Sequence, residues 1–62
     1  MTESYNMSMR KFLKQVGVTS QQQIEKAIRE SGKSSGTVAV KVVLTGDDVG
    51  LNHVVEGEIE LG

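Results

Sequence analysis

The sequence contains no cysteine, no proline and no tryptophan, and it has a single histidine. Without cysteine there are no disulfide bridges or thiolate zinc sites, and one histidine is too few for a zinc-dependent fold. Aromatic residues are scarce, since Tyr5 and Phe12 are the only two. A chain of 62 residues buries only about 60% of its extended surface on folding. Its stability therefore depends on a small apolar core or on a partner.

Long hydrophobic runs are also missing. The longest, at residues 42–44, is far too short to span a bilayer, and no basic stretch followed by an apolar run opens the chain. We therefore expect a cytoplasmic protein without membrane contact. The proportions of hydrophobic residues (37%) and charged residues (24%) are those of an ordinary globular protein, and the length predicts a single small domain over residues 1–62.

The charges are unevenly distributed along the chain although the net charge is only −1. All seven basic residues lie between Arg10 and Lys41, whereas the charged residues after Lys41 are all acidic. This polarity favours an interaction protein with one basic and one acidic surface.

Two amphipathic helices are predicted in the N-terminal half, at about residues 4–16 and 20–31. The first follows from apolar residues at the spacing of one helix face, namely Tyr5, Met9, Phe12, Leu13 and Val16. Gly17 stands where a left-handed residue ends a helix, and a capping box, either Thr19 with Gln22 or Ser20 with Gln23, starts the next one. The second helix has a narrower stripe at Ile24, Ala27 and Ile28 and closes at Ser31-Gly32.

After the flexible segment 32–36, the period of the apolar residues changes from 3.6 to 2. Alternation over about residues 37–45 and 51–61 predicts an antiparallel β-hairpin, so the fold class is α+β in the order ααββ, with the helices on one face of the sheet.

Keeping both apolar sets on one face requires an even-numbered loop. Loops of 47–48 or 46–49 pair Leu44 with Leu51, Val42 with His53, Val40 with Val55 and Val38 with Gly57, and set Lys41 opposite Val54 and diagonal to Glu56. Gly57 predicts a bulge or a close approach of a helix.

Several short motifs together resemble a known family. They are Asn6-Met7, the run from Arg10 to Lys14, the run from Val16 to Gln21, the run from Ile24 to Ala27, and the run from Gly57 to Leu61. The chain resembles, over most of its length, a family of short bacterial proteins classed only as a domain of unknown function. The resemblance implies a small free-standing protein and no particular activity.

One candidate function is nucleic-acid binding through a helix-turn-helix over residues 10–31. Gln22, Gln23, Lys26 and Arg29 have the chemistry to meet bases and phosphates. Glu25 and Glu30 lie on the same helix, however, and the hairpin ends in three glutamates, so the positive surface that such binding needs is weak. The charges therefore argue against nucleic acid as a partner, although the spacing permits it.

The remaining polar groups indicate no catalysis. Glu56, Glu58 and Glu60 project in a straight row and do not converge as the ligands of a hard cation must, so they predict a solvated face. His53, close to Asp47 and Asp48, has no nucleophile at a recognisable spacing, and we assign it to the margin of the core. We expect no enzyme, metal, cofactor or small-molecule substrate.

The leading hypothesis is a non-catalytic interaction or regulatory module that binds a protein partner or forms a homodimer through a sheet edge. Two strands alone are barely stable, and a dimer that completes a four-stranded sheet gains buried area. The predicted interaction surface consists of its charged residues: Arg10, Lys11, Lys14, Lys26, Arg29, Glu56, Glu58 and Glu60.

Overall fold

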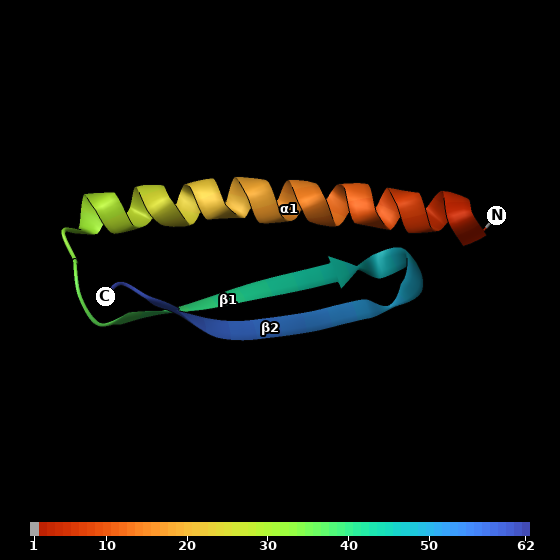
Figure 1. Cartoon of the computed structure of the whole chain (residues 1–62). Helices are drawn as coiled ribbons and strands as arrows, with labels where there is room; N and C mark the ends of the chain where they lie inside the picture. The colour runs from red at the N-terminus through yellow and green to blue at the C-terminus, as the bar shows by residue number, and fades with distance from the viewer. Residues whose placement is uncertain (1) are drawn as a thin grey trace.

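The computed structural model describes the backbone of residues 2–62 and the side chains of residues 3–62. It consists of one helix, α1 (Thr2–Ser31), followed by strand β1 (Thr37–Gly46), the short 3-10 helix η1 (Asp47–Val49) and strand β2 (Leu51–Glu60). The two strands form an antiparallel hairpin, and α1 lies lengthwise along one face of it (Figure 1). The molecule is elongated, with extents of 46 × 20 × 17 Å.

The prediction of two N-terminal helices is wrong, because residues 2–31 form a single helix. Gly17 does not take the left-handed conformation that a helix-ending glycine adopts, since its φ is not positive. Thr19 caps no helix start, and its Oγ1 instead donates a 2.8 Å hydrogen bond to the carbonyl of Gln15 one turn earlier. The turn of the supposed helix-turn-helix over residues 10–31 therefore does not exist.

Continuity of the helix has a physical reason that is visible in the residue spacing. A break at residue 17 leaves as many as four carbonyls and four amides without helical partners, and a chain this small has little packing to offset that cost. The partly covered positions Val16, Ser20, Ile24 and Ile28 follow one another at four-residue spacing straight through the predicted turn. The cost of one interior glycine, about 1 kcal/mol, is smaller than that of a break.

The C-terminal end of α1 is where the sequence placed it. Gly32 has φ 76°, the left-handed conformation of a residue that closes a helix. Ser31 adds local bonds: its Oγ donates to the carbonyl of Ile28 at 2.7 Å and accepts from the amide of Lys33 at 3.1 Å. These contacts end the helix and direct the chain back toward the hairpin.

The α+β class and the hairpin are confirmed, but the register differs by two residues from the prediction. Val42 pairs with Val55, Val40 with Gly57 and Val38 with Ile59, while Leu44 faces His53. The loop has four residues, as one of the alternatives required, yet it runs from Asp47 to Gly50. Gly50 is left-handed, with φ 65°, and its amide closes the turn on the carbonyl of Asp47 at 3.4 Å. That turn keeps Gly46 in the strand, which moves every pair by two.

Two smaller expectations change with the register. Gly57 is neither a bulge nor a close approach, since it pairs regularly with Val40 and an added Cβ would meet no atom within 4 Å. Lys41 stands directly opposite Glu56, and not opposite Val54. The parity of the pairing, even positions of β1 against odd positions of β2, is as predicted, so the apolar sets do share one face.

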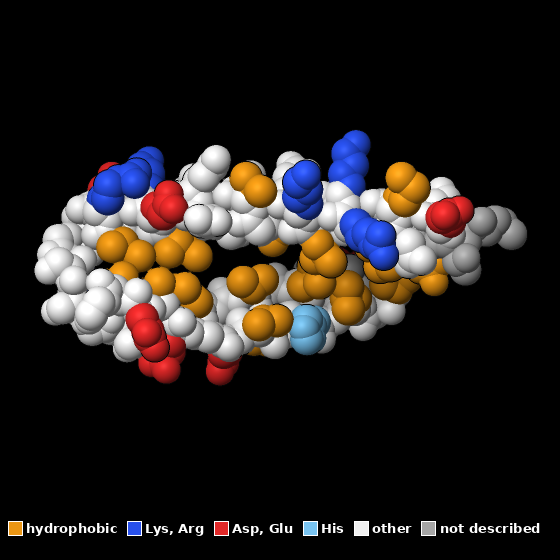
Figure 2. Space-filling view, in the orientation of Figure 1, with side chains coloured by type: hydrophobic (Ala, Val, Ile, Leu, Met, Phe, Trp, Pro, Cys, Tyr) orange, Lys and Arg blue, Asp and Glu red, His pale blue; other side chains and the backbone are white. Residues whose placement is uncertain are grey.

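The helix covers β1 much more than β2. On the sheet face toward α1, four of the five β1 positions are partly covered. Among the five β2 positions on this face, Ile59 is the only one that is partly covered. Hydrophobic side chains gather between the two layers, with a hollow near the middle (Figure 2). Among the described side chains none is fully buried. The accessible surface is 5607 Å², about 1,700 Å² more than the roughly 3,900 Å² of a compact monomer of this mass.

Replacing Val18 by proline tests the continuous helix. Val18 lies two residues from both Val16 and Ser20, so it is on the side of α1 away from the hairpin. In a helix interior proline costs about 3 kcal/mol or more, whereas directly after a helix end it is common. We expect Val18→Pro to unfold the protein in urea or thermal denaturation followed by circular dichroism, and Val18→Ala to leave it folded. A folded Val18→Pro protein would restore the two-helix description.

Replacing Thr19 by alanine also tests the continuous helix, because a helix cap and a helix interior predict opposite effects of this substitution on stability. As a helix cap, Thr19 would contribute about 1 kcal/mol that alanine removes. Within a continuous helix, alanine is the better residue by up to about 0.7 kcal/mol. We expect Thr19→Ala to leave the urea midpoint unchanged or to raise it at fixed protein concentration. A lowered midpoint equivalent to 1 kcal/mol contradicts the structure described here.

Candidate interaction surface

The predicted basic residues form no compact cluster. Arg10, Lys11, Lys14, Lys26 and Arg29 are all exposed on α1. At 1.5 Å per residue, the first and last of them stand about 28 Å apart along the axis. In Figure 2 the visible Lys and Arg side chains are spread along the helix, and Glu25 is the only acidic residue between Arg10 and Arg29. The arrangement is that of a solvated helix surface with a modest positive potential.

The predicted acidic residues lie together on the outer face of the hairpin, away from α1. Glu56, Glu58 and Glu60 stand opposite Lys41, Ala39 and Thr37 on β1. Thr37 Oγ1 donates a 3.4 Å hydrogen bond to Glu58 Oε2, and Lys33 Nζ donates one of 2.7 Å to the carbonyl of Thr37.

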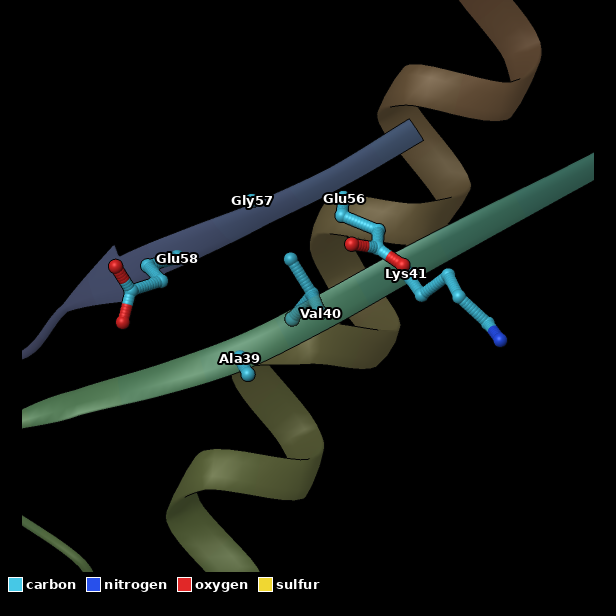
Figure 3. A pocket seen from close by; sticks show the side chains of 6 residues that line it. All are labelled: Ala39, Val40, Lys41, Glu56, Gly57 and Glu58. Carbon is cyan, nitrogen blue, oxygen red and sulfur yellow. The ribbon is translucent and has the colours of Figure 1, made fainter. Parts of the chain in front are cut away.

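Between the strands there is a shallow depression. Figure 3 shows the two glutamates of β2 on either side of Gly57, which has no side chain, with three β1 residues alongside. The lining residues are Ala39, Val40, Lys41, Glu56, Gly57 and Glu58. Its charged groups are one lysine and two carboxylates, all on exposed residues.

The structure places the remaining candidates on different elements. His53 lies on the sheet face toward α1, opposite Leu44, and is exposed, while Asp47 and Asp48 belong to η1. Over the described part of the chain, no three residues of the types that bind metals are placed to hold an ion. No helix within residues 2–62 is both long and apolar enough to cross a membrane.

The largest unexplained feature is apolar, and the sequence prediction assigned it to the core. On α1, four large side chains of the predicted first helix are only about half covered, and on β2 the face toward α1 is open. We call these residues the uncovered apolar surface. They are Tyr5, Met9, Phe12, Leu13, Leu51 and Val55. The one feature of the sequence that could have indicated this exposure is the chain length, because two thin layers from 62 residues cannot enclose so many large side chains.

One flank of α1 lies toward β2. Gly17 and Gln21 line a hollow together with Ile59 of β2, whereas Thr19 and Gln23 line one with β1. Leu13 precedes Gly17 and Gln21 in the same four-residue row of the helix, so it belongs to the flank toward β2. The uncovered part of α1 and the open face of β2 therefore lie on the same side of the molecule.

These features define a helix–hairpin protein of the α+β class with an exposed apolar flank. The whole chain, residues 1–62, matches the model of a family described as "Family of unknown function (DUF6494)". The chain belongs to this family, which agrees with the resemblance noted in the sequence. Neither curated proteins nor solved structures gave a match.

The direct pairing of Lys41 with Glu56 is testable by a double-mutant cycle. Opposite charges facing each other across an antiparallel pair contribute roughly 0.2–1 kcal/mol. We expect Lys41→Glu to lower the free energy of unfolding in urea, and the charge swap Lys41→Glu with Glu56→Lys to recover most of that loss at low salt. The matched control is Lys41→Glu with Glu60→Lys, because Glu60 faces Thr37. Equal recovery in both double variants contradicts the observed register.

Proposed function

We propose that the protein is a small, non-catalytic interaction module of the bacterial cytoplasm, which binds a protein partner or a second copy through the uncovered apolar surface. The observation that carries the proposal is the absence of any fully buried side chain among those described, combined with an accessible surface of 5607 Å². An isolated compact monomer of this mass exposes only about 3,900 Å².

The energetics of folding support the same conclusion. Ordering 62 residues costs conformational entropy, and burial of apolar area is the main term that offsets this cost. Half-covered side chains such as Leu13 and Val55 recover only part of what they recover in a closed core. A partner that covers them stabilises the folded chain by binding it in preference to the unfolded one.

The charges contribute orientation more than affinity in this proposal. The basic residues of α1 and the acidic residues of β2 lie on different outer faces, so they can steer a partner with complementary charge. Exposed charges are screened by salt, whereas apolar contacts are not. Binding through the uncovered apolar surface should therefore persist at high salt.

Affinity capture with two matched variants tests the proposal. Leu13 and Val18 are large aliphatic residues of the same helix with similar exposure, 55% and 50%, but Val18 faces away from the hairpin. We expect wild type and Val18→Asp, used as bait in an extract of the native host, to retain the same protein at 500 mM salt. That protein is either an untagged copy of the chain or another protein, and Leu13→Asp should lose it.

Two controls complete this experiment. Circular dichroism must show α1 and the hairpin in each bait, so that loss of binding does not reflect loss of folding. Competition with untagged wild-type chain must release the retained protein, which distinguishes saturable binding from adhesion. The proposal fails if the wild type retains nothing that competes, or if Leu13→Asp retains the same protein as well as Val18→Asp does.

A further inference from the structure

The area to be covered points to a second copy of the chain as the partner. Two chains of 5607 Å² each would bury about 4,700 Å² in total on reaching the roughly 6,500 Å² expected for a compact protein of twice the mass. Stable homodimer interfaces bury about 2,000–5,000 Å². The uncovered apolar surface is present in every folded copy of the chain, and a second copy is the one partner that is always synthesised together with it.

The hydrogen bonds show which backbone groups of β2 are free to pair. The amide of Leu61 donates to the carbonyl of Gly36 at 2.9 Å, so these two residues form a hydrogen-bonded pair that continues the ladder. Such pairs alternate along an antiparallel hairpin. The odd-numbered residues of β2 therefore bond to β1, and the even-numbered ones direct their amides and carbonyls to the open edge. These are Asn52, Val54, Glu56, Glu58 and Glu60.

The two open edges of the hairpin differ in how far α1 covers the sheet beside them, and this difference indicates which edge pairs with a second chain. At β1 the inner face is already under α1, and the helix flank there presents Thr19 and Gln23, which are polar. At β2 the inner face is open, and the flank above it includes Leu13. Pairing at β2 brings the apolar flanks together, whereas pairing at β1 leaves them exposed.

We propose that two chains pair β2 with β2 in antiparallel fashion about a two-fold axis perpendicular to the sheet. The result is a four-stranded sheet with both α1 helices side by side on one face. Adjacent strands are about 4.8 Å apart, so the two β1 strands, which the helices mainly cover, lie about 14 Å apart, and the open inner faces of both β2 strands lie between the two helices. This inference rests on the proposed function and names the partner of the same surface.

The glutamates determine the register of this pairing. Only edge-directed, even-numbered residues can form its hydrogen bonds, and two registers give nearly complete overlap of the ten-residue strands. One places Glu56 opposite the partner's Glu56, which is unfavourable because like charges then face each other. The other places Glu56 opposite the partner's Val54 and centres the two-fold axis on Val55. The acidic row, which stands on the outer face, selects the second register without blocking the edge.

Cysteine cross-linking tests this geometry, because the natural chain has no cysteine. At the axis, the two copies of residue 55 form a non-hydrogen-bonded pair with Cα atoms about 4.5 Å apart, within reach of a disulfide. Val42 is the cross-strand neighbour of Val55 with similar exposure, but its two copies lie about 14 Å apart. Under mild oxidation with glutathione disulfide, we expect Val55→Cys to form a covalent dimer at least tenfold faster than Val42→Cys.

Proline variants provide a second, independent test. Val43 and Val54 face each other across the hairpin, and each directs its amide to an open edge, that of β1 and that of β2 respectively. Proline removes the edge donor in each case while leaving the hairpin bonds in place. By analytical ultracentrifugation, we expect Val54→Pro to raise the dimer dissociation constant at least tenfold, and Val43→Pro to leave it close to that of the wild type.

The outcomes separate this inference from the proposed function. A wild-type chain that is monomeric at 1 mM, or equal cross-linking of Val55→Cys and Val42→Cys, overturns the β2 pairing. If such a monomer still captures a host protein that Leu13→Asp loses, the interaction role stands and only the second copy is wrong. A dimer that is cross-linked through Val55→Cys and weakened by Val54→Pro alone establishes the partner and the edge together.

Discussion

The packing of one side of α1 against β1 is the tertiary contact on which the rest of this molecule depends. A residue inside a closed core touches six to twelve others, and this requires neighbours on every side. Here the helical layer is one element wide, so Ile24 and Ile28 have the sheet below them but open flanks beside them. For this reason the most covered side chains are only partly covered, and β2 is left with an open inner face.

That constraint connects the shape to the proposed role. A chain this small could in principle have folded back on itself as two short helices, which would cover both strands. The continuous α1 instead extends along the hairpin, and the radius of gyration of 15.0 Å exceeds the roughly 11 Å expected of a compact chain of this length. In the proposed role, a second molecule covers β2. In that proposal, the same open flank that weakens the isolated chain supplies the area of the interface.

The charged residues have a different place from the one expected of them. Sequence patterning identified Arg10 and Glu56 correctly as exposed, but it treated the charges as the interaction surface itself. In the structure the basic residues are spread along α1, and the acidic row stands on the outer face of the hairpin. Because exposed charges contribute little affinity, their part in the proposed dimer is to select the register. The apolar surface that carries the proposal was assigned to a core that one helix cannot close.

What the sequence alone determined are the features governed by neighbouring residues. The period-2 pattern produced the hairpin and the parity of its pairing, and Ser31-Gly32 ended the helix through contacts within one turn. Tertiary structure decided what depends on competition between distant alternatives. A glycine and a capping box indicated a break at residue 17, but the row through Val16, Ser20 and Ile24 packs on β1 only if the helix is continuous. Likewise, the turn closed at Gly50 chose among registers that the apolar pattern could not distinguish, because a shift of two residues keeps every side chain on the same face.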